Sequence, residues 1–392
     1  MFKKKEYITI FIILVTEVLG FSLILPFLPF YVQKLGGTPL TVGLILTTFS
    51  LLQFVSAPIM GKLSDTYGRK PLLMLSQLST FISFIMLGFS KSIPMIFLSR
   101  AMDGLLGSNA TIAQSYLSDI SSKEDRSKAY GISGAAFGFG FLIGPAIGGS
   151  LAKISFALPA FIAAFFSLAS IIMTKFLLKE TVTNSHKKEF NIKKAIKDIN
   201  PINIISNFSN KTLAIPLMLM FAYALSHTIY VSNFSLFGER QFGLTVDKVG
   251  YVLAYIGLVS VILRGFLLEK IIDKFNEKNI IKFGYISNMI GLAFFGFSHS
   301  IPMLFLAVTF FSIGSGLLRP TLMAEISRSA DENRQGEIMG VSNSLGSIAQ
   351  IIGPITGGYA LTYISASSLP LMAVLISLIG FTTYSRFKKS TN

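Results

Sequence analysis

Long apolar runs separated by short polar segments dominate this chain. A helix needs about 20 apolar residues to cross the hydrocarbon core of a bilayer. Twelve runs approach this length, and they cover residues 7–32, 42–61, 72–90, 93–117, 129–152, 156–178, 212–237, 247–268, 280–298, 301–326, 337–363 and 367–385. The first run is longer than a secretory signal and lacks a small-residue cleavage site, so we expect it to remain as span 1. The pattern predicts an all-α integral membrane protein with twelve transmembrane helices.

The composition agrees with a membrane protein and narrows the chemistry. Hydrophobic residues make up 52% of the 392 residues, charged residues 14%, and the mean hydropathy is +0.64. A soluble domain carries about 25% charged residues, so a soluble enzyme and a disordered protein are both excluded. The chain has no Cys and three His, which argues against a thiolate or His-based metal site. We expect no metal and no cofactor.

The net charge of +15 is distributed unevenly between the two sides of the predicted membrane. Of the 34 Lys and Arg residues, 26 fall on the side that holds both termini, five on the other side and three inside spans. Cytoplasmic loops carry the excess of positive charge. The asymmetry predicts a multi-pass protein of the cell membrane with both termini in the cytoplasm. It also accounts for the basic charge without a nucleic-acid partner.

The sequence contains an internal repeat at an offset of 208 residues. Residues 88–95, Gly-Phe-Ser-Lys-Ser-Ile-Pro-Met, return at 296–303 with seven of eight identical. The repeat predicts two six-helix bundles in the same orientation, residues 1–178 and 212–392, joined by a cytoplasmic loop at 179–211. Parallel repeats with a site near the midplane are typical of transporters. Within the loop, apolar residues at helical spacing indicate either an amphipathic helix on the inner leaflet or a solvated linker.

The loop after span 2 combines glycines, one acid and adjacent cations. Glycine permits a tight reversal of the chain, and the helix dipole at the start of span 11 could bind the acid. The alternative is a positively charged turn that only sets topology. The segment resembles the loop signature of the major facilitator superfamily, and the resemblance implies a gating role for Gly61, Asp65, Gly68, Arg69 and Lys70.

Span 5 carries a run of small residues around a proline. Small residues four apart allow close helix approach, and a proline inside a helix kinks it. A tightly packed, kinked helix is the simpler interpretation. The pattern also resembles the antiporter motif of drug:proton antiporters, which implies export. The motif residues are Gly140, Gly144, Pro145, Gly148 and Gly149. Residues 15–150 carry the most specific likeness, which is to tetracycline:proton antiporters.

Three ionisable residues near the membrane midplane are candidates for proton coupling. Glu17 lies about 15 Å into span 1 from the cytoplasm at 1.5 Å per residue, and Arg100 and Asp103 lie on one face of span 4. Ionisable groups at this depth are costly and indicate function. The alternatives are that Asp103 only neutralises Arg100, or that Arg100 neutralises Glu17. Possible cavity-lining residues are Asn109, Gln114, His227, Tyr230 and Arg319.

Each cavity candidate also has a simpler interpretation. A lone His in a span is usually hydrogen-bonded, and an aromatic residue usually packs in the core or against lipid. Arg264, near the end of span 8, could extend to the inner interface.

The resemblance implies a fold and a function together. We expect the major facilitator fold and a monomeric, proton-coupled antiporter that exports small amphipathic compounds by alternating access. Its partners would be a small-molecule substrate, protons and the lipid bilayer. An uptake symporter or facilitator for a nutrient is the first alternative, and a non-transporting sensor on the same fold is the second. An enzyme is not expected.

Overall fold

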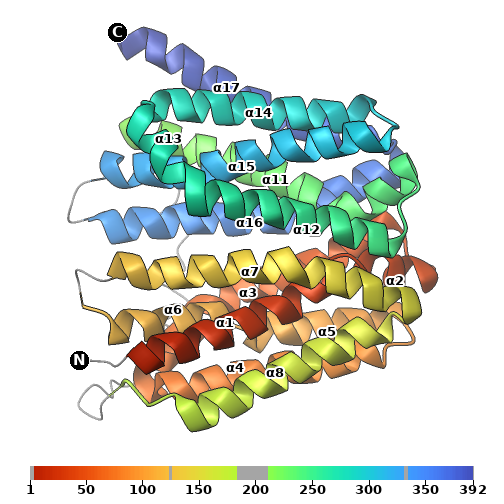
Figure 1. Cartoon of the computed structure of the whole chain (residues 1–392), viewed down its shortest axis with the longest axis vertical. Helices are drawn as coiled ribbons and strands as arrows, with labels where there is room; N and C mark the ends of the chain where they lie inside the picture. The colour runs from red at the N-terminus through yellow and green to blue at the C-terminus, as the bar shows by residue number, and fades with distance from the viewer. Residues whose placement is uncertain (1–3, 123–125, 183–210, 331–333, 392) are drawn as a thin grey trace. The chain divides into compact units, whose positions relative to one another are not determined.

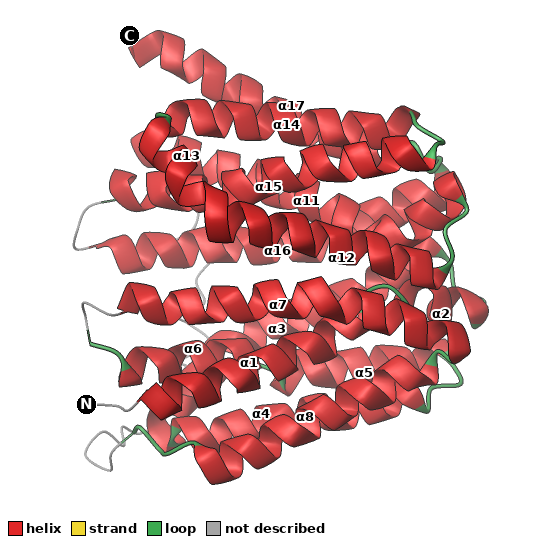
Figure 2. Cartoon of the chain, in the orientation of Figure 1, coloured by secondary structure: helices red, strands yellow, loops and turns green. Residues whose placement is uncertain are grey.

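Helices form nearly all of the chain that the computed structural model describes, which is residues 4–122, 126–182, 211–330 and 334–391 (Figures 1 and 2). A helix satisfies its backbone hydrogen bonds within one segment, which an apolar surrounding requires. Ten helical segments are long and apolar enough to cross a membrane. The amphipathic helix considered for the central loop lies outside the described residues.

The first half of the chain supplies six predicted spans as eight helices. They are α1 (Lys4–Ile24), α2 (Leu28–Lys34), α3 (Pro39–Tyr67), α4 (Arg69–Gly88), α5 (Ile93–Leu106), α6 (Asn109–Ile120), α7 (Arg126–Ile154) and α8 (Ala157–Leu177). Span 1 turns at residues 25–27, around Pro26, and comprises α1 and α2. Span 4 is divided into α5 and α6, each shorter than a full crossing.

The second half repeats this order with different interruptions. Its helices are α11 (Lys211–Phe242), α12 (Val246–Ile262), the π-helix η3 (Leu263–Leu267), α13 (Leu268–Lys274), α14 (Glu277–Phe297), α15 (Ile301–Ser329), α16 (Gln335–Tyr363) and α17 (Ser368–Thr391). Together, α12, η3 and α13 form one span. The apolar part of α17, Ser368–Tyr384, is shorter than the other spans.

Two compact units divide the chain. Unit 1 comprises Met1–Gly36, Thr48–Ile199 and Val246–Gly257, and unit 2 comprises Gly37–Thr47, Asn200–Thr245 and Leu258–Asn392. The units follow the two expected bundles except at the beginnings of α3 and α12, each of which packs in the unit of the other half. The division into bundles at the central loop stays a prediction.

In unit 1, α1 lies against α7 and α8, and α4 lies against α8 (Figure 1). The core between these helices contains fully buried side chains such as Ile13, Leu73 and Tyr116. In unit 2, α11 lies against α16 and α17, and α14 lies against α15. An aromatic cluster around Tyr230 and Phe311 fills part of that core.

Close helix contacts at glycines recur in both units. In unit 1, a Cβ on Gly250 of α12 would overlap the carbonyl oxygen of Pro145. In unit 2, a Cβ on Gly43 of α3 would overlap the carbonyl oxygen of Pro354. The internal repeat in the sequence therefore has a counterpart in the packing, because equivalent kinked helices approach equivalent glycines.

The face of α7 toward α1 should tolerate no added side chain. A Cβ on Gly148 would overlap the backbone carbonyl of Leu23, which cannot move without shifting α1, whereas a Cβ on Gly134 of the same helix would have no neighbour within 4 Å. We expect Gly148→Ala to lose stability by roughly 1–3 kcal/mol through overpacking. Gly134→Ala should gain up to about 1 kcal/mol from helix propensity. The stability of each variant is measured as the temperature at which the purified protein no longer elutes as a single monodisperse peak. Equal temperatures for the two variants would contradict the close contact.

Candidate functional site

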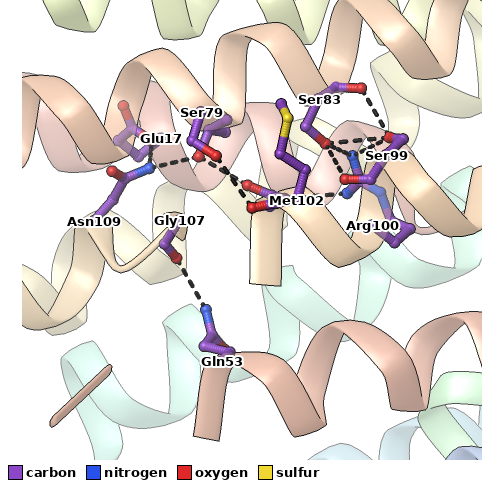
Figure 3. Close-up of polar contacts among 11 residues, drawn as sticks. Glu17, Gln53, Ser79, Ser83, Ser99, Arg100, Met102, Gly107 and Asn109 are labelled. Carbon is purple, nitrogen blue, oxygen red and sulfur yellow. Dashed lines mark hydrogen bonds and ion pairs between the residues drawn. The ribbon is translucent and has the colours of Figure 1, made fainter. Parts of the chain in front are cut away.

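Glu17 of α1 is the first residue of a polar network inside unit 1 (Figure 3). The Asn109 side-chain nitrogen donates a hydrogen bond to one Glu17 carboxylate oxygen at 2.7 Å. The other oxygen is buried and has no hydrogen-bond partner among the described residues. Gln77 and Ser170 lie near the same carboxyl group. Glu17 therefore has polar neighbours but no basic partner among the described residues.

The network continues from Asn109 toward Asp103. The Asn109 nitrogen also donates to the Thr80 hydroxyl at 3.0 Å, and that hydroxyl donates to an Asp103 carboxylate oxygen at 2.8 Å. Glu17 and Asp103 are thus joined through two uncharged side chains from α6 and α4. The sequence indicates Asn109 as a possible cavity residue but does not single out Thr80 or Gln77. Thr80 and Gln77 belong to a row of polar residues at helical spacing in span 3, and that row is the sequence pattern that could have identified them.

Arg100 lies at the other end of this network and pairs with Asp103. The shortest distance between the guanidinium and the carboxylate is 3.3 Å, and the two side chains are 4% and 7% exposed. Arg100 also donates to Ser83 at 2.6 Å and lies over the Phe84 ring. Because Arg100 has Asp103 as its counter-ion, the alternative that Arg100 neutralises Glu17 is not what the geometry shows.

The break between α5 and α6 fixes the position of Asn109. The chain turns at Gly107 and Ser108, and Ser108 N–H donates to the Leu106 carbonyl at 2.9 Å. Side chains of α3 bind carbonyls at the break: Gln53 donates to Gly107 and Ser56 to Leu105. A Cβ on Gly107 would overlap Asp103, so only glycine fits this turn.

The antiporter motif of α7 packs on two sides. Gly140, Gly144 and Gly148 face α1 at Val18, Ser22 and Leu23, where an added Cβ would overlap in each case. The Ser22 hydroxyl also donates to the Gly140 carbonyl at 2.9 Å. On the opposite side, Pro145 and Gly149 lie against the start of α12. The close packing expected from the sequence is confirmed, and it supports the helix that carries Glu17.

The loop between α3 and α4 is organised around the Arg69 side chain, which is 10% exposed. Arg69 pairs with Asp65 at 2.5 Å and with Asp119 at 2.8 Å, and it donates to the Ser64 hydroxyl at 2.7 Å. The Asp65 carboxylate thus has Arg69 as its partner, although the sequence had suggested the start of span 11.

The same loop begins helix α4. Glu180 accepts hydrogen bonds from the backbone N–H groups of Arg69 and Lys70 at 2.9 and 3.0 Å, so a carboxylate occupies the positive end of the helix dipole. Gly68 has φ of 108°, a conformation that favours glycine. Gly61 lies one turn before Asp65 and faces Thr111 of α6, where an added Cβ would make an ordinary van der Waals contact.

A polar cavity of about 280 Å³ lies beside Arg69. Its lining residues are Arg69, Thr111, Gln114, Ser115, Ser118 and Asp119. Gln114 lines this cavity beside the loop between α3 and α4, and its place in a transport cavity stays a prediction. No group of three or more His, Cys, Asp or Glu in the described ranges is arranged to hold a metal ion.

The candidates of unit 2 separate into buried and exposed residues. Tyr230, expected to line a cavity, is instead fully buried, because the rings of Phe234, Phe237, Phe295 and Phe311 surround it. His227 stacks on Phe311 at 5.5 Å between ring centroids. Arg319, which precedes the helix-internal Pro320 of α15, is exposed.

Comparison with known families agrees with this arrangement. The family model described as Major Facilitator Superfamily matches residues 10–354 and 265–390. The chain belongs to the Major Facilitator Superfamily. It is therefore a multi-pass protein of a membrane transporter family, and not an enzyme, and the expected major facilitator fold is confirmed.

Relatives within the superfamily extend over almost the whole chain. The chain is 30% identical over 376 residues to the tetracycline resistance protein, class B, of Escherichia coli, covering 95% of this chain and 92% of the relative. It is 31% identical over 367 residues to multidrug resistance protein 2 of Bacillus subtilis (strain 168), covering 90% and 89%. Among solved structures, a nucleoside transporter shares the fold with a TM-score of 0.81 at 12% identity, covering 97% of this chain and 99% of that one.

Arg69 should not be replaceable by lysine. The guanidinium contacts two carboxylates and a hydroxyl at once, and one ammonium group cannot reproduce that planar arrangement. We expect Arg69→Lys to lower stability by roughly 1–3 kcal/mol, because a partly buried acceptor loses its donor. Lys70→Arg in the same loop should have little effect. Thermal unfolding of the two purified variants checks this, and a wild-type transition for Arg69→Lys would be evidence against the network.

Proposed function

We propose that this member of the superfamily is a secondary active transporter that exports small amphipathic compounds, including drugs, in exchange for protons. The names of the relatives support a drug transporter, and the antiporter motif supports export. We also propose a monomer with both termini in the cytoplasm, on the basis of the charge distribution.

The single observation that carries proton coupling is the environment of Glu17. An ionisable group within a span is costly and by default functional. Glu17 has one hydrogen-bonded and one unpaired carboxylate oxygen, whereas the charges of Arg100 and Asp103 balance each other. Glu17 is therefore the acid that can gain or lose a proton without leaving a buried arginine unpaired. We assign Asp103 and Arg100 to positioning this network.

Asn109 and Thr80 give the proposed proton site a connection to the rest of unit 1. Asn109 follows the break between α5 and α6, so a movement of either helix changes its hydrogen bond to Glu17. In the proposed cycle, protonation of Glu17 from outside favours release of the substrate, and loss of the proton to the cytoplasm resets the site. One proton crossing 100 mV gains about 2.3 kcal/mol, which corresponds to roughly fifty-fold accumulation.

We further propose that the loop from Gly61 to Lys70 acts as the inner gate. The ion pairs of Arg69 with Asp65 and Asp119 join α3, α4 and α6. A change in these contacts would alter the cytoplasmic ends of all three helices together.

Glu17→Gln should keep the fold and substrate binding but lose proton-driven export, because the amide resembles the protonated acid and cannot release a proton. The measurement is tetracycline efflux against an imposed pH gradient in proteoliposomes. Glu6→Gln, at the beginning of the same helix, is the matched control and should export at close to the wild-type rate.

The direction of transport and its coupling to protons distinguish an exporter from an uptake symporter and from a sensor. If Glu17→Gln concentrates tetracycline as the wild type does, Glu17 is not the coupling acid and Asp103→Asn becomes the next variant to measure. Proton-driven uptake into cells would favour a symporter. Binding without any substrate-stimulated proton flux would favour a sensor.

A further inference from the structure

Two arginines in unit 2 have an environment unlike that of Arg100. Arg264 lies on η3 and Arg319 on α15, and both side chains are exposed. Within the described residues, neither guanidinium has a hydrogen bond or an ion pair, whereas Arg100 has Asp103, Ser83 and Ser99 as partners. Arginine inside a span normally pairs with an acid or with carbonyl groups. The two guanidinium groups are therefore charges without a counter-ion in the described part of the chain.

The two arginines lie at the same depth. Arg264 is 18 residues after the first and 10 before the last residue of its span, Val246–Lys274, and Arg319 has the same position in Ile301–Ser329. A single span, Glu277–Phe297, separates the two, so they cross in the same direction. Charged residues follow closely in both segments, beginning at Glu269 in one and at Glu325 in the other. Both arginines therefore lie about one and a half helical turns before the charged end of their segment.

The helix turns that carry Arg264 and Arg319 converge with α11. Packing explains the convergence: the Leu263 side chain fills the space beside Gly316, and the Tyr223 hydroxyl donates to the Ser315 carbonyl at 3.3 Å. Two like charges near each other repel, and an anion between them would remove that repulsion.

The fold itself does not require these charges. At the repeat offset of 208, Arg264 corresponds to Ser56 and Arg319 to Thr111 in the first half. Ser56 lies in the α-helix α3, whereas Arg264 lies in a π-helix. A π-helical turn inside an α-helix frequently marks a functional site. The second half therefore has both the charges and a local helix geometry that the first half lacks.

We propose that Arg264 and Arg319 bind the anionic group of the transported compound, so that the preferred substrates are organic anions or zwitterions with a carboxylate, sulfonate or phosphate. This proposal rests on the proposed function of the chain as an exporter. Guanidinium binds such groups in a planar, two-pronged geometry. The half-buried ring of His227, 5.6 Å from the buried Tyr223 ring, offers an aromatic surface to the apolar part of the compound.

A matched series of probes tests the charge preference. 1-Naphthoate, 1-naphthamide and 1-naphthylmethylammonium share one ring system and carry an anionic, a neutral and a cationic group. Binding of each radiolabelled probe is measured by equilibrium dialysis on the full chain in phosphatidylcholine nanodiscs. We expect the wild type to bind naphthoate at least tenfold more tightly than the other two.

Variants of the two arginines test which residues cause the preference for the anionic probe. Arg264→Gln and Arg319→Gln should each weaken naphthoate binding about tenfold or more and leave naphthamide binding unchanged, which also shows that the variants are folded. Arg319→Lys should retain part of the affinity. Lys270→Gln removes one positive charge from the same unit, near the end of the same span, and should bind naphthoate like the wild type. Unchanged naphthoate binding in both Gln variants, or equal loss of naphthoate and naphthamide, overturns the proposal.

A second experiment, which varies the lipid of the nanodiscs, distinguishes a site for a substrate from a site for a lipid headgroup. If phosphatidylglycerol in the nanodiscs abolishes naphthoate binding and itself binds in an arginine-dependent way, the site belongs to an anionic lipid and the proposal is wrong. If naphthoate binding survives in phosphatidylglycerol, the proposal is supported. Arginine-dependent binding in a protein that shows no proton-driven efflux of tetracycline or naphthoate would leave the anion site standing and refute the exporter function instead.

Discussion

A polar side chain inside an apolar helix bundle must find its partners among its immediate neighbours, because no bulk water is there to replace them. This constraint explains the arrangement of unit 1. The carbonyls at the break between α5 and α6 bind Gln53 and Ser56, and the break places Asn109 where its amide reaches Glu17. The orphaned Glu17 oxygen and the Gln77 amide are among the buried polar groups of unit 1 that have no hydrogen-bond partner in the described residues. Incomplete satisfaction in a low-dielectric region leaves a group responsive to a proton or a ligand.

The two halves of the repeat share a scaffold but differ in chemistry. At the repeat offset, Asp103 corresponds to Phe311 and Arg100 to Val308, so the balanced ion pair of unit 1 is replaced by part of the aromatic core of unit 2. Conversely, the uncharged Ser56 and Thr111 correspond to Arg264 and Arg319. Glycine contacts at helix kinks are common to both units. The backbone packing is therefore the feature that the repeat preserves, and the ionisable groups are additions specific to each half.

The sequence predicted what depends on composition and local spacing. Apolar run lengths located the spans, and glycines four apart indicated the close contact of α7 with α1. The three-residue spacing of Arg100 and Asp103 indicated their pair. It could not predict the bond from Asn109 to Glu17, which joins residues 92 apart, or the break at Gly107, which lies far from Pro94, the one proline of its apolar run. The π-helix at Leu263–Leu267 and the exchange of the first residues of α3 and α12 between units depend on tertiary packing that no local pattern records.

If the proposed proton acid and the proposed anion site are both correct, the two ligands bind to different units and do not compete for one group. Coupling must then be conformational, and α3 and α12 are the helices that contribute residues to both units. The charges also affect the driving force. Inward movement of one proton and outward movement of one organic anion transfer two charges in the favourable direction of an inside-negative potential, which gains about 4.6 kcal/mol per 100 mV. A neutral substrate gains half of that, so an anion site would double the contribution of the same membrane potential to export.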